Sequence, residues 1–448
     1  MNSSTLKNLL QKLSSFGLET LELFKTKPRQ DFSASIQSLC QSLLGLQGEA
    51  ASIAIAEEII LSYQRATAEE KSGFFRYLHD KLAADPVATT AAIARYQAAP
   101  SQANLQALMA ACEAPRLELL RTLNTAPGGT MALISMREDL LKIGSTAAVR
   151  DILDADFATL FRAWFNRGFL QLRRIDWQTP ALILETLIEY ESVHEIKGWP
   201  DLRRRLQQDR RCFGFFHPAI PNVPLIFVEV ALTHGFSNNI QELLKPAAAE
   251  TADKPFNTAV FYSINNCLFG LRGISFGNFL IKQVVEDLSL SNPEIRHYVT
   301  LSPVPGLLKW LAAKPEVLQQ CRPEEQQAIQ ALLPAPQSSQ LRLSPVLPSL
   351  LPRLCAYYLL QAKSRGKPLD AVARFHLGNG ARLERINWLA DISPNGLQQS
   401  AGLMVNYVYD MATVAHNHQA YEQRNEVIAS GAVRKLLEAG RQGSTALP

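Results

Sequence analysis

The sequence lacks most of the short motifs by which enzymes are recognised. Its six cysteines are scattered without a CxxC pair, and its eight histidines show no HExxH spacing. Neither a zinc site nor a secreted disulfide framework is therefore indicated, and reduced thiols favour a cytoplasmic protein. The sequence also has no GxSxG nucleophile elbow and neither the GxGxxG nor the GxxxxGK[ST] phosphate-binding pattern.

Long apolar runs and a strong net charge are also missing. The best apolar candidate, LIFVEVAL, is short and contains Glu229, so no membrane span is expected. A net charge of +4 over 448 residues does not indicate a nucleic-acid-binding protein. With 47% hydrophobic and 19% charged residues, the chain has the composition of a globular protein of two or three domains.

The first region, residues 1–195, has a helical pattern. Apolar side chains recur at helical spacing, as at Leu6, Leu9, Leu10 and Leu13. The stretch MNSSTLKNLLQKLSSF reads as an amphipathic helix and lacks the apolar core of a signal peptide. We predict an all-α helical bundle whose outer faces serve for homo-oligomerisation. The arginine-rich run at 203–211 is expected to form a solvated or intersubunit helix face.

The second region, residues 196–448, alternates short apolar strands with helices. Strands are expected at 224–232, 258–264, 296–303, 385–392 and 402–410. The helix FLIKQVVEDL separates the second strand from the third, and a helical, proline-punctuated insertion is expected at about 312–370. This pattern predicts an α/β (or α+β) domain built on a largely continuous sheet.

Three glycines lie between the strand at 258–264 and the helix that follows it: Gly270, Gly273 and Gly277. A strand that leads through a glycine-rich loop into a helix start can bring backbone N–H groups to a phosphate. A tight turn alone would also place glycines at this junction.

Two further stretches contain candidate catalytic residues. In TLSPVPG, Ser302 ends a strand and precedes Pro303, whose ring restricts the turn and holds the hydroxyl in a defined place. In ARFHLGNGARLERINWLAD, His376 precedes a turn. A serine before proline is usually a turn residue and a lone histidine is more often structural, so spacing alone leaves both interpretations open.

In these stretches the sequence resembles the malonyl-CoA decarboxylase family. The resemblance covers the C-terminal half, in order through 210–233, FYSINNCLFGLRGISFGNFLIKQVV, TLSPVPGLLKWL, ARFHLGNGARLERINWLADIS and GLMVNYVYD. It implies conversion of malonyl-CoA to acetyl-CoA and carbon dioxide, in fatty acid metabolism, without a metal or an organic cofactor. It also implies assembly through the helical N-terminal domain into a dimer or tetramer, and a catalytic domain of the GNAT acyltransferase fold.

The same resemblance implies roles for individual residues. The family's catalytic serine falls on Ser302, its catalytic histidine on His376 and a family tyrosine on Tyr409. In the GNAT fold, the turn after the fourth strand binds the pyrophosphate of CoA, which here corresponds to GLRGISFGN. The residues expected to contact substrate, in this turn or elsewhere, are Gly270, Gly273, Ser275, Gly277, Asn265, Asn387 and Glu229.

The reaction itself requires few groups. Loss of carbon dioxide leaves a thioester enolate, which donors already aimed at the thioester oxygen would stabilise. We expect His376 to hold or polarise Ser302 and the malonyl carboxylate while Ser302 relays a proton to C2; the reverse division is the alternative. The alternative function is an acyl-CoA-dependent N-acyltransferase, and a third interpretation is a CoA-binding protein that leaves malonyl-CoA intact.

Overall fold

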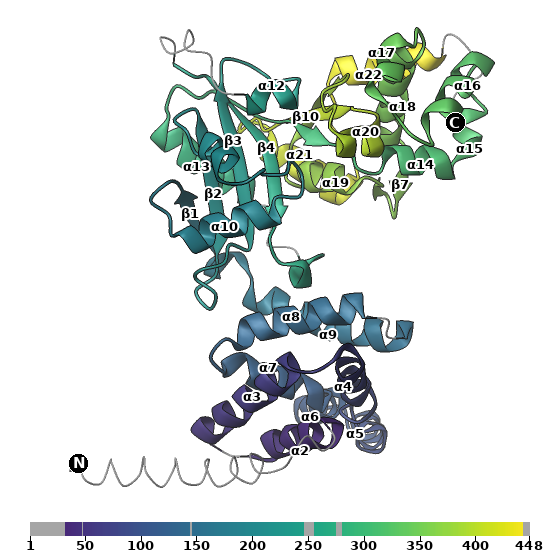
Figure 1. Ribbon diagram of the computed structural model, residues 1–448. Coiled ribbons are helices and arrows are strands. Elements are labelled where there is room, and N and C mark those ends of the chain that lie inside the picture. The colour runs from purple at the N-terminus through teal and green to yellow at the C-terminus, as the bar shows by residue number, and fades with distance from the viewer. Residues whose placement is uncertain (1–31, 47, 144–145, 246–254, 275–279, 442–448) are drawn as a thin grey trace. The chain divides into compact units, whose positions relative to one another are not determined.

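The computed structural model describes residues 32–46, 48–143, 146–245, 255–274 and 280–441 (Figure 1). The chain divides into two compact units, each described by itself below. The first unit comprises Met1–Phe169, His217–Pro221 and Leu268–Ser275, and the second comprises Leu170–Phe216, Asn222–Cys267 and Phe276–Pro448. No helix of the described residues is both long and apolar enough to cross a membrane.

The first unit is built from helices, as the apolar spacing predicts. Its main helices are α2 (Phe32–Gly45), α3 (Glu49–Gln64), α4 (Ala68–Asp80), α5 (Pro86–Ala98), α6 (Gln102–Cys112), α7 (Pro115–Thr125), α8 (Gly129–Lys142) and α9 (Ala147–Trp164). Local sequence fixes several starts: Thr67 and Glu70 form a capping box before α4, and the Asp85 carboxylate caps α5. The amphipathic helix predicted at the N-terminus lies outside the described residues.

The second unit is organised around an eight-stranded sheet of order β1-β2-β3-β4-β5-β10-β6, with β9 paired to β10. Its strands are β1 (Gln171–Ile175), β2 (Arg210–Phe216), β3 (Ile226–Thr233), β4 (Thr258–Asn266), β5 (His297–Thr300), β6 (Ser302–Pro303), β9 (Arg382–Asn387) and β10 (Met404–Val408). Neighbouring strands are antiparallel except β4 and β5, which are parallel. A parallel pair needs a crossover, and α13 (Leu280–Ser291) supplies it.

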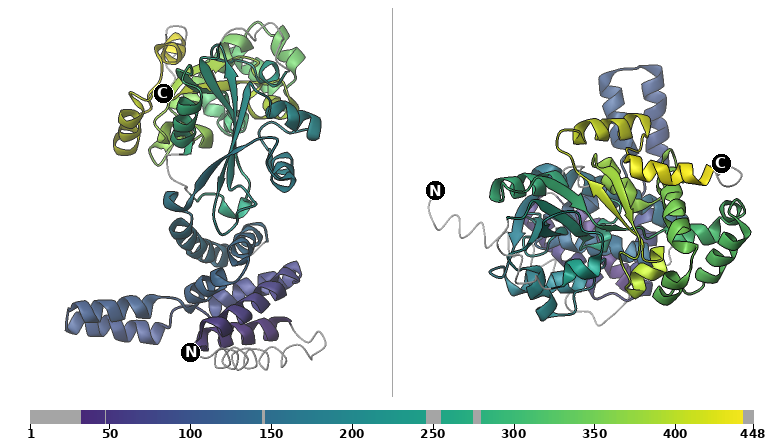
Figure 2. Two further views of the ribbon diagram at one scale, coloured as in Figure 1. Left: turned by 90° about the vertical axis from the view of Figure 1, so that its left-hand side faces the viewer. Right: turned by 90° about the horizontal axis from the view of Figure 1, so that it is seen from above.

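The helices of the second unit lie between its strands in the sequence or follow the last strand, β10. They are α10 (Ala181–Tyr190), α11 (Trp199–Arg205), α12 (Ile240–Leu244), α14 (Leu307–Ala313), α15 (Pro315–Leu318), α16 (Pro323–Leu332), α17 (Ser338–Leu343), α18 (Leu347–Leu360), α19 (Ala371–Gly378), α20 (Pro394–Ser400), α21 (Val414–Arg424) and α22 (Gly431–Arg441). The segment expected as an insertion contains α15 to α18 and the small hairpin of β7 (Lys363–Ser364) and β8 (Lys367–Pro368). Helices α14 to α18 gather to one side of the sheet (Figures 1 and 2).

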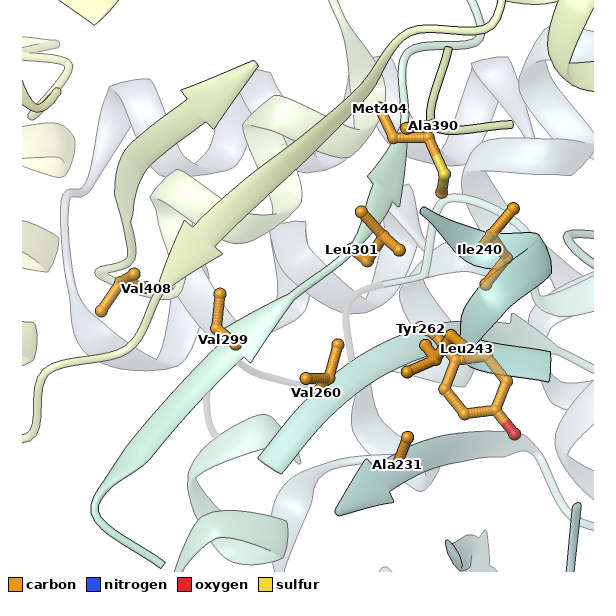
Figure 3. Packing of buried hydrophobic residues seen from close by; sticks show 10 residues of the cluster. All are labelled: Ala231, Ile240, Leu243, Val260, Tyr262, Val299, Leu301, Ala390, Met404 and Val408. Carbon is orange, nitrogen blue, oxygen red and sulfur yellow. The ribbon is translucent and has the colours of Figure 1, made fainter. Parts of the chain in front are cut away.

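The centre of the sheet is packed by apolar side chains from several strands, from α12 and from the segment after β9 (Figure 3). This cluster consists of Ala231, Ile240, Leu243, Val260, Tyr262, Val299, Leu301, Ala390, Met404 and Val408. Because β5 and β10 both contribute to it, burial of this core fixes the positions of Thr300 and Tyr407, which flank the candidate site described below.

Two strands of the sheet, β1 and β2, are absent from the strands expected from the sequence. β1 is a mostly exposed edge strand with two arginines, so it has no apolar signature. Its pairing with β2 draws residues 171–216 into the second unit. The predicted domain boundary near 195 therefore differs from the division after Phe169, because α10 continues the helical pattern beyond that point.

The arginine-rich run at 203–211 is not a solvated helix face, and that prediction is wrong for three of its members. Arg204, Arg205 and Arg210 are all buried. Arg204 makes a two-pronged ion pair with Asp209, at 2.7 and 2.9 Å, and Arg210 contacts the same carboxylate at 2.6 Å. The sequence does not distinguish a buried, paired arginine from a solvated one, so the number of arginines in a run does not predict their exposure.

Candidate active site

Ser302 lies on the short strand β6, which pairs with β10 opposite Val405. Its side chain is buried, with the Oγ atom 3.0 Å from Nε2 of His376 and 2.8 Å from Oγ1 of Thr300. Thr300 is two residues earlier, so its side chain and that of Ser302 share one face of the extended chain. The serine hydroxyl is thus held between a hydroxyl and an imidazole.

His376 lies on α19, in its last turn before the Asn379–Gly380 turn that the sequence indicates. The Asp370 carboxylate caps the start of this helix by accepting the N–H of Ala373 at 2.8 Å. The imidazole is 3% exposed, and it stacks on the Tyr407 ring with the centroids 4.6 Å apart. This stacking fixes the ring plane.

The other imidazole nitrogen meets Tyr409. The Nδ1 atom of His376 is 2.8 Å from the Tyr409 hydroxyl, and the Tyr409 N–H donates to the carbonyl of Tyr298 at 2.9 Å. Tyr409 directly follows β10, so the strand end positions the phenol. Ser302, His376 and Tyr409, far apart in sequence, therefore form one continuous hydrogen-bonded chain.

The direction of this chain follows from its donors and acceptors. When the Tyr409 hydroxyl donates to Nδ1, the neutral imidazole carries its proton on Nε2 and donates to Ser302, which donates to Thr300. With the opposite tautomer, the Tyr409 proton has no acceptor among the described residues. We therefore assign the Nε2–H tautomer.

Burial keeps every member of the chain uncharged. Desolvation lowers the pKa of His376 to about 3, so its imidazole is neutral at pH 7. Desolvation also raises the pKa of the Tyr409 phenol well above its usual value. A neutral imidazole that donates from Nε2 can stabilise a developing oxyanion without first losing a proton.

Ser302 and His376 open into a cavity of about 250 Å³. Its walls come from the C-terminal end of β4, from β6 and from α19. Ser263 and Asn266 add polar groups, while apolar side chains line most of the remainder: Val193, Ile226, Phe261, Ile264, Pro303, Ala371, Val372 and Phe375. A small, mostly apolar cavity strengthens electrostatic interactions inside it.

Asn265 does not line this cavity. Its amide nitrogen donates to Glu191 Oε2 at 2.7 Å, and its amide oxygen accepts from the N–H and the hydroxyl of Ser192. Glu191 in turn accepts from Ser263 at 2.7 Å. The predicted substrate contact is therefore already engaged in holding the segment that follows α10.

Asn387 and Glu229 also lie away from the cavity wall. Asn387 donates to Asn406 at 2.8 Å, and Asn406 donates to the Thr300 carbonyl at 2.6 Å, so Asn387 supports the site from behind. Glu229 is 1% exposed and lies 2.9 Å from Arg205. Burial raises the pKa of Glu229 to about 8, an effect that Arg205 opposes.

Gly270 and Gly273 belong to the first unit, where the short helix Phe269–Leu271 packs on α8. A Cβ atom on Gly270 would lie 2.0 Å from the Ile134 carbonyl oxygen, so close packing alone requires this glycine. Arg137 donates to the carbonyls of Gly270 and Arg272, at 2.6 and 3.0 Å. Gly273 has a φ of +78° and open space around its Cβ position, and Ser275 and Gly277 lie outside the described residues.

Sequence reasoning missed Thr300, Asn406 and Tyr407. Thr300 Oγ1 contacts Ser302 and also accepts the N–H of Tyr407 at 3.1 Å. Residues two apart on a strand lie on the same face of the sheet. Thr300 precedes Ser302 by two residues and Tyr407 precedes Tyr409 by two, so this period could have indicated that Thr300 and Tyr407 lie beside the site. Within the described residues, no group of three or more His, Cys, Asp or Glu side chains could hold a metal ion.

Comparison with known proteins gives a consistent result along the chain. The family model "Malonyl-CoA decarboxylase C-terminal domain" matches residues 168–446, and "Malonyl-CoA decarboxylase N-terminal domain" matches residues 82–165. The structure is similar to malonyl-CoA decarboxylases from Rhodopseudomonas palustris (45% identity, TM-score 0.84) and Agrobacterium vitis (48%, 0.82), each covering 90% of this chain and 99% of theirs. The mitochondrial malonyl-CoA decarboxylase of Anser anser anser is 36% identical over 352 residues, 73% of this chain and 70% of that protein.

Proposed function

Because the chain belongs to the malonyl-CoA decarboxylase family, we propose that Ser302, His376 and Tyr409 are the residues with which it converts malonyl-CoA to acetyl-CoA. The observation that carries this proposal is the hydrogen-bonded chain of these three side chains, which reaches the wall of a mostly apolar cavity. The protein is a carboxy-lyase, and the comparisons give no support to the N-acyltransferase alternative.

The proposed mechanism begins with cleavage of the bond between C2 and the carboxylate. Its electron pair moves into the thioester, so negative charge develops on the thioester oxygen. The Ser302 hydroxyl, turned from Thr300 toward the substrate, donates to that oxygen, and His376 Nε2–H supports it by donating to Oγ. The low dielectric of the cavity strengthens both interactions.

Protonation of the enolate completes the reaction. After carbon dioxide leaves, Ser302 delivers its proton to C2 and receives the Nε2 proton of His376. The imidazole takes up a proton from water in the same step, so that no imidazolate forms, and the Tyr409 hydroxyl keeps the ring in the correct tautomer and orientation. No acyl-enzyme is formed in this mechanism.

Thr300 is proposed as a positioning residue in this relay. Replacing Thr300 with Val should lower kcat about tenfold and change KM much less, because one hydrogen bond to Ser302 is lost and the serine rotamer is freed. Thr300→Ser restores the hydroxyl and should recover most of the rate. Steady-state kinetics with malonyl-CoA measures both, and an equal loss in the serine variant would show that the methyl group matters and the hydroxyl does not.

We further propose that the second unit has the GNAT acyltransferase fold and that the glycine turn binds CoA phosphates. β4 leads through this turn to α13 and then to β5, which is parallel to β4. The Gly273 N–H belongs to a residue with a positive φ and open surroundings, which suits backbone contact with a phosphate.

Gly273→Val should therefore weaken CoA binding about tenfold or more, measured by calorimetry, because a branched side chain disfavours the positive φ and obstructs the phosphate. Gly198→Val is the matched control, since Gly198 also has a positive φ and open space but precedes α11. Equal affinities for the wild type and Gly273→Val would contradict the assignment.

We propose that the first unit assembles the protein into a homo-oligomer. Helices α5 and α6 pack on each other and project from the rest of this unit (Figure 2). They expose Val87, Ile93 and Met109, at 78%, 41% and 66%. These exposed apolar side chains, all on one projecting helical hairpin, are the surface on which we base the assembly proposal.

The Val87→Glu/Met109→Glu double variant should dissociate the oligomer to monomers in sedimentation velocity, because two buried charges would oppose the contact. Its helical circular dichroism should stay unchanged, as both side chains are exposed in the chain described here. A wild-type protein that remains monomeric at high concentration would remove the assembly proposal.

A cytoplasmic location is retained as a proposal, since all six cysteines are free thiols and five of them are buried. The curated relatives from goose, rat and mouse are described as mitochondrial, so the organelle of those proteins differs from the one proposed for this chain. Fractionation of the source cells followed by immunoblotting would decide between them.

A further inference from the structure

A second cavity, of about 390 Å³, lies in the second unit at the other end of β4. One of its walls is Leu232, which pairs with Ala259 near the start of β4. The catalytic cavity is lined instead by Ile226, which pairs with Asn266 at the end of the same strand. At roughly 3.3 Å per residue the two ends are about 23 Å apart, so the cavities are separate.

Two arginines dominate this second cavity. Arg174 lies on β1 opposite Phe213, and Arg211 precedes Phe213 by two residues on β2. The two side chains therefore lie diagonally on one face of the sheet. Like charges placed together repel each other, and burial with this repulsion lowers the pKa of Arg211.

Neither arginine has a carboxylate within ion-pair distance in the part of the chain that the structure describes. The nearest candidate in sequence, Asp209, is occupied by Arg204 and Arg210, and Asp287 attracts Arg211 only at longer range. The charge of Arg211 is partly buried and has no carboxylate partner, which is costly, so the arrangement favours an anion.

Arg211 is also held in place. Its Nη1 donates to the carbonyls of Gln208 and Arg210, each at 2.7 Å, and its Nη2 is 3.4 Å from the Asn292 side-chain oxygen. Its Nε is buried and has no partner among the described residues. The guanidinium is thus oriented before any ligand arrives, which lowers the entropy lost on binding.

The remaining walls define the rest of the ligand. Leu232 and Phe256 are apolar, and the Phe256 ring packs against His234 with the centroids 5.1 Å apart. We propose that this cavity binds a phosphomonoester whose small apolar or ring group contacts Phe256 while Arg174 and Arg211 neutralise the dianion. Guanidinium groups match phosphate oxygens in two-pronged geometry, which favours phosphate over a halide or a single carboxylate.

Phenyl phosphate is a suitable probe because it combines the dianion with one ring. It should be titrated calorimetrically into the full-length protein with saturating acetyl-CoA present, so that the CoA phosphate site is already occupied. We expect one site per chain whose affinity falls as salt is raised. Benzenesulfonate, a monoanion of the same shape, should bind more weakly.

The arginine variants give the decisive comparison. Arg174→Gln should weaken phenyl phosphate binding about tenfold or more, as one charge-assisted hydrogen-bonding group is lost. Arg173→Gln is the matched control, because it removes the same charge from the neighbouring position of β1, where Arg173 lies over the Phe216 ring. Arg211→Lys keeps the positive charge but loses the two-pronged hydrogen-bonding geometry of the guanidinium group, and should also weaken binding.

The proposal is overturned if the wild type does not bind the probe, or if Arg173→Gln weakens binding as much as Arg174→Gln does. The second result would mean that only overall charge attracts the anion. Arg174 is exposed, so its variant should fold, and a thermal melt with and without probe verifies this. Decarboxylation is expected to be unchanged in Arg174→Gln, so failure here leaves the assignment of Ser302 and His376 untouched.

Discussion

His376→Ala and Ser302→Ala should each lower kcat for malonyl-CoA by roughly 10²–10⁴-fold, the range typical of general acid–base groups. Each change breaks the contact between Nε2 and Oγ, 3.0 Å apart, through which charge is stabilised and the proton delivered. KM should change much less, because most of the binding energy of an acyl-CoA comes from its CoA portion. Carbon dioxide release in the absence of any amine measures the rate.

The double variant should be hardly slower than the slower single variant, since the two residues act as one unit. Losses that multiply would show that they act independently and would contradict the relay. Ser263→Ala serves as the control, because Ser263 also lines the cavity but donates to Glu191 and not to His376. Its rate should stay within about tenfold of the wild type.

Arg205→Met should lower the free energy of unfolding by about 3–5 kcal/mol. The Arg205 guanidinium donates to Glu229 at 2.9 Å and to the carbonyls of His194 and Glu195, at 2.7 and 3.0 Å. Glu229 and the His194 carbonyl would lose their donor inside the protein, where no water replaces it. Urea denaturation at pH 7 measures the change.

Glu229→Gln tests the same cluster from the other side. Burial raises the pKa of Glu229 to about 8 from 4.5, so the folded protein holds a proton that the unfolded chain releases. This contribution to stability is full below pH 4.5 and declines as the pH rises toward 8, and the glutamine variant should lose that slope. An increase in KM without a change in stability would instead support the substrate contact expected from the sequence.

The sequence predicted the candidate catalytic residues because each lies in a contiguous motif. Ser302 and His376 lie in TLSPVPG and FHLGNG, and Tyr409 ends NYVY, so the neighbouring residues were sufficient to select them. Local sequence did not predict the roles of Thr300 and Asn387. Thr300 reads as an ordinary strand residue, and Asn387 reads as a substrate contact although it supports Asn406 behind the site.

The strands, too, divide into those that local sequence predicts and those that it does not. Those with continuous apolar runs, β3 and β4, were predicted within two residues at each end, because a buried strand needs such a run. β1 was missed since an edge strand is stabilised by backbone pairing with β2, which leaves no periodic pattern in its side chains. The extent of the second unit depends on that pairing and so could not be inferred from local composition.

The sequence by itself determined the family and the strands with continuous apolar runs, and it selected the serine, histidine and tyrosine as catalytic candidates, because these depend on neighbouring residues. Only the tertiary structure decided which polar groups have partners. Glu229 and Asn265 contact Arg205 and Glu191 inside the protein, whereas Ser302 and His376 face a cavity. The reason is physical: burial and hydrogen bonding depend on what a side chain meets across the fold, and those partners are up to 74 positions away in the chain.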